Sequence, residues 1–211
     1  MTRILAIADE VDEALYGDKL YELRPDVIVS CGDLPFEYLE NLVSRANVPL
    51  LYVPGNHDPD LEHNDVHWGT MVTAPIPGPQ GCDSVDVRVF DGPGLRVAGL
   101  GGSLRYNSGD NQHTQTEMRL RALRLEMRLR WKRAWKGGRL DVLVTHAPPL
   151  GLGDLDDDAH RGFAAFHRLV TTFAPRLLIH GHIHPVSRRQ NELKMGDTLV
   201  VNAIPRRLLE V

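Results

Sequence analysis

The sequence predicts an α/β sandwich of mixed β-sheets in a chain of 211 residues. Short apolar runs alternate with helix-length segments, which is the pattern of strands joined by crossover helices. Hairpin-like segments occupy both the middle and the end of the chain, and these add antiparallel neighbours to the parallel ones. With 42% hydrophobic and 25% charged residues, the composition is that of an ordinary globular protein. A disordered or fibrous protein is therefore excluded.

The first half of the chain begins with a βαβαβ pattern. Apolar runs predict strands at 3–8, 27–31 and 49–53. A helix-length stretch at 13–23 separates the first two strands, and a helix is expected at 36–45, where the apolar residues have helical spacing. The next segment, 54–81, is rich in Pro, Gly, Asn and His, a composition typical of long surface loops.

The second half of the chain contains strands of both orientations. Alternating valines at 85–89, followed by apolar residues at 95–97, predict a hairpin. A long helix is expected at 110–136 and another at 161–173. Further strands are expected at 140–145, 176–180, 186–193, 198–203 and 206–211.

Charge and cysteine content narrow the class of protein. The 24 basic and 28 acidic residues give a net charge of −4, and the apolar run at 4–8 is much shorter than a signal-peptide core or a membrane span. Two cysteines, Cys31 and Cys82, cannot form a disulfide framework or a four-cysteine zinc site. We therefore expect one domain over 1–211, in a reducing cytoplasm and without membrane contact.

Polar groups that can bind metals follow the predicted buried strands. They are Asp9, Gly32-Asp33, Gly55-Asn56-His57-Asp58, His146 and Gly181-His182-Ile183-His184. The carboxyl ends of parallel strands meet at one edge of a sheet, so these side chains should converge. In an extended backbone, side chains two residues apart point the same way, so His182 and His184 are expected to reach one centre. The pattern predicts a metal site.

The donor types indicate which metals would bind. Carboxylates combined with an amide oxygen and imidazoles suit Mn, Fe or Zn better than Ca or Mg, which prefer oxygen ligands alone. One ion cannot use so many donors, whereas two ions about 3.5–4 Å apart and sharing a carboxylate can. We expect two divalent transition-metal ions, with Mn preferred over Fe or Zn, and Asp33 as the bridging ligand.

The order of these motifs, from Asp9 to His184, resembles the calcineurin-like metallophosphoesterase superfamily, and most closely its small bacterial phosphodiesterase-type members. The resemblance implies a four-layer α/β/β/α sandwich of two mixed sheets flanked by helices. It also implies hydrolysis of phosphodiesters or phosphomonoesters. By the same resemblance, a first metal site takes Asp9, Asp33 and His184. A second metal site takes Asp33, Asn56, His146 and His182.

The first motif departs from the superfamily pattern. That pattern is Asp-x-His, but this chain has Asp9-Glu10-Val11, so the histidine that completes the first metal site is absent. Three alternatives remain open: Glu10 replaces it, Asp12 replaces it, or water fills the position. The second motif is also shortened, because Leu34 follows Gly32-Asp33 where the superfamily often has Asn or Asp.

Residues around the metal ligands supply the remaining chemistry. The resemblance makes His57 the general acid that protonates the leaving oxygen, and Asp58 is a candidate to orient it. Substrate contacts are expected from Arg105, Tyr106 and Arg161, because arginine binds phosphate oxygens bidentately and tyrosine stacks on a base. A structural role for these loops is the alternative. The expected substrate is a small phosphoester, with nucleotide-type phosphodiesters first.

The segment 112–139 is a basic helical insertion with nine basic and two acidic residues, a net charge of +7. The rest of the chain therefore has a net charge of −11. It contains an apolar stripe that includes Leu120, Met127 and Trp131, with Trp135 one turn further on. A solvated face or a contact between copies in a homo-oligomer is favoured over nucleic-acid binding. Two other functions stay open: a nuclease of the same superfamily, and a catalytically weakened regulatory protein that binds metal or nucleotide.

Overall fold

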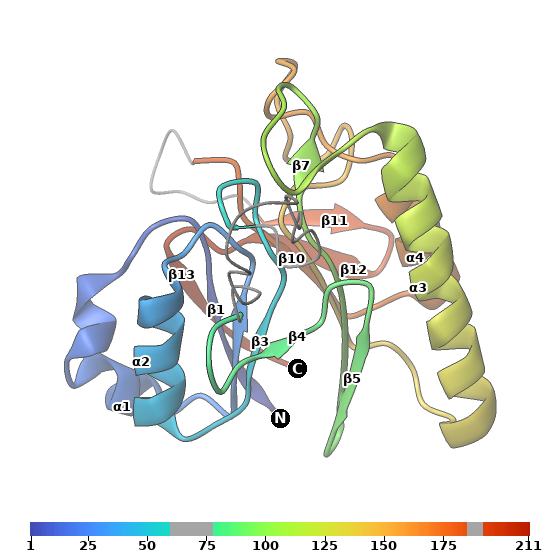
Figure 1. The fold of residues 1–211 in the computed structure, drawn as a ribbon. Helices are drawn as coiled ribbons and strands as arrows, with labels where there is room; N and C mark the ends of the chain where they lie inside the picture. The colour runs from blue at the N-terminus through green and yellow to red at the C-terminus, as the bar shows by residue number, and fades with distance from the viewer. Residues whose placement is uncertain (60–77, 185–191) are drawn as a thin grey trace, which may run out of the picture.

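Two β-sheets pack face to face and helices cover the outer face of each, which gives four layers in the order α/β/β/α (Figure 1). The computed structural model describes residues 1–59, 78–184 and 192–211. The fold predicted from the sequence is confirmed. None of the helices in the described ranges is both long enough and apolar enough to cross a membrane.

The first sheet has the strand order β13-β1-β2-β3-β4. Its strands are β1 (Arg3–Ile7), β2 (Val27–Ser30), β3 (Leu50–Tyr52), β4 (Asp83–Ser84) and β13 (Arg206–Glu210). Neighbours from β1 to β4 are parallel, whereas β13 runs antiparallel to β1 at the edge. The helical elements beside this sheet are η1 (Glu13–Tyr16), α1 (Lys19–Leu23) and α2 (Phe36–Ala46).

The second sheet has the strand order β11-β12-β10-β9-β6-β5. Its strands are β5 (Val89–Gly92), β6 (Leu95–Leu100), β9 (Val142–Thr145), β10 (Leu177–His180), β11 (Leu193–Met195) and β12 (Thr198–Asn202). The four central strands are parallel and the two edge strands are antiparallel. Two helices cover it, α3 (Gln115–Lys136) and α4 (Ala165–Phe173), and a small parallel pair, β7 (Ser103–Leu104) and β8 (Gln112–His113), precedes α3.

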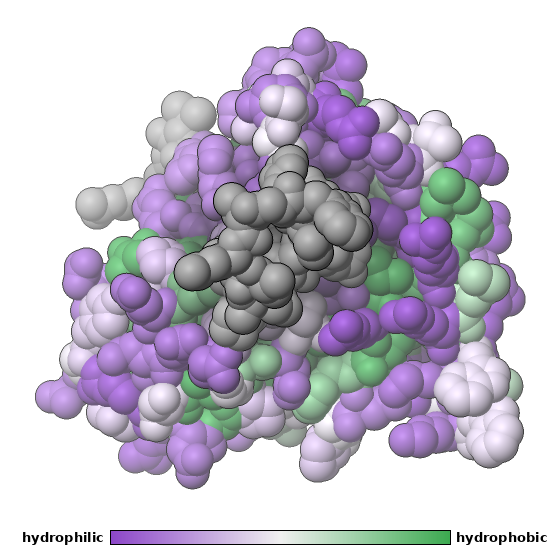
Figure 2. All heavy atoms as spheres, in the orientation of Figure 1, coloured by the Kyte–Doolittle hydropathy of each residue, from purple (hydrophilic) through white to green (hydrophobic). Residues whose placement is uncertain are grey.

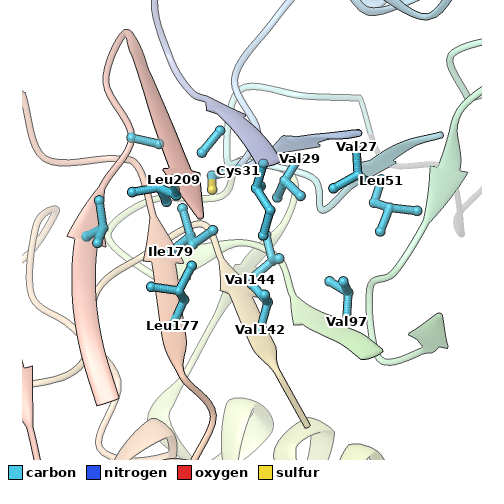
Figure 3. Packing of buried hydrophobic residues seen from close by; sticks show 14 of the residues in the cluster. Val27, Val29, Cys31, Leu51, Val97, Val142, Val144, Leu177, Ile179 and Leu209 are labelled. Atoms are coloured by element: carbon cyan, nitrogen blue, oxygen red, sulfur yellow. The ribbon is translucent and has the colours of Figure 1, made fainter. Parts of the chain in front are cut away.

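The main core lies between the two sheets. Figure 3 shows Val27, Val29 and Leu51 of the first sheet facing Val142, Val144 and other apolar residues of the second. Successive side chains of a strand alternate between its two faces. The residues on the opposite faces therefore build two outer cores, one with α1 and α2 and one with α3 and α4. Burial on both faces explains why these strands are continuous apolar runs in the sequence.

The observed elements differ from the predicted ones in several places. The first hairpin strand, expected at 85–89, is β5 and begins only at Val89, because the backbone turns at Val87, where φ is 51°. The helix expected at 161–173 begins at Ala165, and the one expected at 110–136 begins at Gln115.

The helix expected at 13–23 is divided into η1 and α1, because Gly17 closes the first turn and the chain restarts at Asp18. The strand expected at 186–193 falls largely on residues outside the described part of the chain, and β11 begins at Leu193. The basic helix expected in 112–139 is α3, which starts at a capping box formed by Thr114 and Glu117.

Candidate metal centre

The candidate ligands lie just beyond the carboxyl ends of parallel strands from both sheets. Asp9 follows β1, Asp33 follows β2 and Asn56 follows β3, while His146 follows β9 directly and His182 comes two residues after β10. Asp9, Asp33 and His182 all have left-handed backbone conformations, with φ of 59°, 56° and 66°. Such values are uncommon outside glycine and often mark functional sites. The chain turns sharply as it leaves these strands.

His146 is at the centre of a fully buried part of the site. Its Nδ1 lies 2.7 Å from the Cys31 carbonyl oxygen, and its Nε2 lies 2.9 Å from Oδ1 of Asn56 and 3.4 Å from a carboxylate oxygen of Asp33. Burial alone would lower the pKa of His146, but the Asp33 carboxylate outweighs this and raises that pKa to about 9. Both ring nitrogens of His146 face acceptors, and each nitrogen carries a proton when the imidazole is charged. A metal ion bound at Nε2 would replace the proton on that nitrogen.

Asp33 is held by the loop that carries the next motif. Its Oδ1 accepts a hydrogen bond from the His57 amide at 2.8 Å. Burial acts to raise the pKa of Asp33, but the hydrogen bond and charge of His146 outweigh it and hold that pKa below its usual value. Gly55 is required here, because a Cβ at this position would lie 2.0 Å from the Asp33 carboxylate. Asp33 is therefore ionised and fixed in orientation.

His182 approaches the same centre from the second sheet. Its ring lies 4.8 Å from the His146 ring, centroid to centroid, and its Nε2 lies 2.7 Å from the Ala159 carbonyl oxygen. Burial, with the charge of His146, lowers the pKa of His182 to about 4. The neutral imidazole that results is the form that binds metals. Donor atoms of Asp33, His146 and His182 all lie within 4.8 Å of one another, close enough to hold one ion.

A second, more exposed part of the site surrounds Asp9. The Asp9 carboxylate accepts hydrogen bonds from the His182 amide at 2.9 and 3.1 Å, and burial raises the pKa of Asp9. Gly181 permits this approach, since a Cβ there would lie 2.3 Å from the carboxylate. Beyond it, Nδ1 of His184 lies 2.9 Å from a carboxylate oxygen of Glu10, and both side chains are more than half exposed.

Glu10, Val11 and Asp12 point in three different directions. Glu10 contacts His184, whereas Val11 packs against the apolar cluster between the first sheet and its helices. The Asp12 carboxylate caps η1 through the Ala14 amide and forms an ion pair with Arg206. Of the two carboxylates that could replace the missing histidine, the structure brings Glu10 to a candidate ligand and uses Asp12 elsewhere.

Sequence comparison identifies the family. The profile described as metallophosphoesterase, calcineurin superfamily, matches residues 33–208. The chain belongs to this superfamily. The match includes every candidate ligand except Asp9, so the atypical first motif lies outside it. The resemblance found in the motifs is thereby confirmed.

Solved structures agree on the fold of this chain. A crystal structure with 18% sequence identity aligns with a TM-score of 0.63, covering 96% of this chain and 90% of that chain. The crystal structure of TT1561 of Thermus thermophilus aligns at 19% identity with a TM-score of 0.61, covering 96% of this chain and 88% of that chain. At these identities the likeness shows the fold alone. No curated protein sequence matches the chain.

The structure brings one of the three expected substrate contacts beside the candidate ligands. The Tyr106 hydroxyl accepts a hydrogen bond from Nδ2 of Asn56 at 3.2 Å. Arg105 forms an ion pair with Glu117 at 3.0 Å instead, and Arg161 donates to the Asp156 carbonyl oxygen at 3.2 Å. Tyr106 therefore contacts a candidate ligand directly, while the two arginines are engaged by protein groups.

Two expectations about this site need correction. Residues 181–184 are not extended strand, because β10 ends at His180, so His182 and His184 do not point the same way as neighbours in a strand would. Asp58 does not orient the His57 ring: its Oδ2 accepts hydrogen bonds from the amides of Gly55 at 2.8 Å and Asp33 at 3.0 Å. Asp58 instead joins the loops that carry Asp33 and Asn56.

The site also includes His160, which the sequence offers with Arg161 as a candidate on the substrate side, and two backbone carbonyls that sequence reasoning did not identify. The His160 ring lies 5.4 Å from the His182 ring, and the carbonyl oxygens of Cys31 and Ala159 orient the two buried imidazoles. Backbone carbonyls carry no sequence signal.

Proposed function

We propose that this chain is a binuclear metal-dependent phosphoesterase that hydrolyses small phosphodiesters, with nucleotide-type diesters as the first class and phosphomonoesters as the second. Membership of the superfamily supports a hydrolase of phosphoesters. The observation that carries the proposal is the convergence of Asp33, His146 and His182 donor atoms within 4.8 Å, at strand ends contributed by both sheets.

The donor set fits divalent transition metals. Asp33, Asn56, His146 and His182 combine a carboxylate, an amide oxygen and imidazoles, and would hold the second ion. Asp9 and His184, with Asp33 as the shared carboxylate, would hold the first ion. Bound there, such ions supply an activated water and neutralise charge on the phosphoryl group. We infer Mn as the preferred metal, with Fe or Zn as alternatives.

Side chains of the loop after β3 act on the substrate rather than on the metals. His57 is exposed and its amide is fixed by Asp33, a candidate ligand, which leaves the ring free to meet a substrate. Its role is to give a proton to the oxygen of the leaving group as the ester bond breaks. The Tyr106 hydroxyl, bonded to Asn56, would orient the phosphoester or its leaving group.

A metal add-back assay tests the proposal. The purified chain is stripped by chelation and dialysis, then supplied separately with Mn, Fe, Co, Ni or Zn and tested on aryl and nucleotide phosphodiesters and their monoesters. We expect no hydrolysis without metal, restoration by Mn, and diesters cleaved faster than monoesters. Full activity after exhaustive chelation, or an inactive panel under every metal, would contradict the proposal.

A regulatory protein that binds metal without efficient hydrolysis is the second candidate, and one observation favours it. Val11 packs against the apolar cluster where the superfamily has a metal-binding histidine, and His184 and Glu10 on that side are more than half exposed. Metal binding together with an inactive substrate panel would select this second function.

A further inference from the structure

The outward face of α3 carries large apolar side chains. Leu120, Met127, Trp131 and Trp135 are 52, 62, 64 and 78% exposed. They lie on the side opposite the buried residues of the helix, which include Met118, Leu125 and Leu129. In Figure 1 the helix forms the edge of the molecule, and Figure 2 shows apolar and pale residues there bordered by hydrophilic ones. Contiguous exposed apolar surface of this kind marks an interaction site.

The charges beside this stripe are almost entirely positive. The two acidic residues of α3 are already neutralised, Glu117 by Arg105 and Glu126 by Arg130 and Arg168. Five cations on α3 form no ion pair with the described part of the chain: Arg119, Arg124, Arg128, Arg133 and Lys136. Arg124 and Arg128 are exposed and lie three or four residues from members of the stripe, so they share its face of the helix. The outer face of α3 therefore combines exposed apolar side chains with unneutralised positive charge, and its complement is an apolar surface that carries negative charge.

We propose that α3 docks on the surface of an anionic lipid bilayer. Apolar side chains of a helix lying in the interface enter the acyl boundary, while flanking arginines reach the lipid phosphates. Tryptophan favours the same interfacial zone. The helix lies on the bilayer and does not cross it, in agreement with the absence of a spanning helix in the described ranges. The proposal replaces the expectation that the protein makes no membrane contact.

Two other partners fit the surface less well. Nucleic acid does not need the leucine and methionine of the stripe, and the rings of Trp131 and Trp135 already pack on each other at 5.8 Å between centroids, so no base can enter between them. A second copy joined through the same helix would place two positively charged faces together, which is repulsive. The acidic residues elsewhere in the chain would repel an anionic bilayer. Salt at physiological concentration screens this repulsion for charges more than about 8–10 Å from the bilayer surface.

Vesicle sedimentation of the full chain tests the proposal. The protein is mixed with phosphatidylcholine vesicles with and without phosphatidylserine, at low and high salt. We expect binding to the anionic vesicles, a steep loss at high salt, and weak binding to phosphatidylcholine alone. The variant Trp131→Ser/Trp135→Ser should lose binding, whereas Tyr21→Ser, which alters an exposed aromatic residue on α1, should not.

Charge variants separate the electrostatic part of the interaction. Removing two cations of the same face in Arg124→Gln/Arg128→Gln should weaken binding by about fivefold for each cation. The control Lys194→Gln, an exposed cation on β11, should bind as the unaltered chain does. Circular dichroism and hydrolysis of a soluble diester should stay unchanged in the tryptophan variant, which shows that the fold and the metal centre are intact.

Three results would overturn the proposal. The first is equal or absent binding to both vesicle types. The second is that the chain binds a short oligonucleotide in a salt-dependent way, loses this binding in the tryptophan variant, and does not bind vesicles. This result would assign the surface to nucleic acid. The third is a dimer in solution that dissociates in the tryptophan variant and does not bind vesicles, which assigns the surface to a second copy.

Discussion

The two halves of the metal centre are built differently. Around the second metal site, His146 is fully buried and His182 is 7% exposed, and backbone carbonyls fix both rings. Around the first, His184 and Glu10 are 59 and 52% exposed, and their mutual contact is the one hydrogen bond that either side chain makes within the described ranges. The buried half is preorganised, whereas the exposed half must be ordered when an ion binds.

This difference has a consequence for affinity. Groups that orient metal ligands typically contribute about 10–100-fold to metal affinity, and the buried half has such groups in Cys31, Ala159 and Asp58. Ordering two exposed side chains at the other half costs conformational entropy. We therefore expect a tight second site and a weak first site within one binuclear centre.

The largest effect is expected at the carboxylate shared by both halves. Asp33→Asn keeps the shape of the side chain but removes the bridging charge, so both ions should bind poorly. Hydrolysis should fall by more than the roughly 10²–10⁴-fold attributed to a general acid. The measurements are turnover on a diester and metal content by mass spectrometry, with the exposed Asp83→Asn as control. Retained activity with full metal content would show that Asp33 is not the bridge.

The next effect concerns a residue outside both halves. His57→Ala should lower turnover by roughly 10²–10⁴-fold, because the leaving group loses its proton donor. Metal content should not change, since the ring is exposed and the Asp33 contact is made by the His57 amide, which the substitution keeps. Loss of metal in this variant would make His57 a ligand and would move it into the metal centre.

Asp58 is expected to affect both the stability of the fold and the positions of the ligands in the buried half. Asp58→Ala leaves the amides of Gly55 and Asp33 without their acceptor, which costs about 1–3 kcal/mol of the free energy of unfolding. The affinity of the second site should fall about 10–100-fold. Thermal unfolding of the metal-free protein and a metal titration measure the two effects. A drop in affinity at the first site alone would contradict the comparison.

The smallest effect is expected at the exposed half. Glu10→Gln should weaken the first site by on the order of tenfold, whereas Asp12→Asn should alter stability through Arg206 and leave metal binding unchanged. Val11→His should destabilise the apolar cluster without tightening the first site. Metal titrations of the three variants decide the matter. Tighter binding in Val11→His would show that the superfamily position is open to a ligand.

The sequence predicted the part of the site that depends on parallel strands. Asp9, Asp33, Asn56 and His146 each follow an apolar run, and strand ends converge wherever parallel strands pair. The role of Asp12 could not be predicted, because its partner Arg206 is at the other end of the chain and comes beside it through the pairing of β13 with β1. The contact of Glu10 with His184 likewise joins residues far apart in the sequence. The orientation of His182 depends on a left-handed turn that its residue type does not indicate.

The most direct test of an unequal binuclear centre is a calorimetric titration of the metal-free protein with Mn²⁺. We expect two binding events of different affinity in the unaltered chain. His146→Gln should abolish the tighter event, and His184→Gln should abolish only the weaker one. A single event of one ion in the unaltered chain, or the same loss in both variants, would contradict the division of the site into a preorganised half and an exposed half.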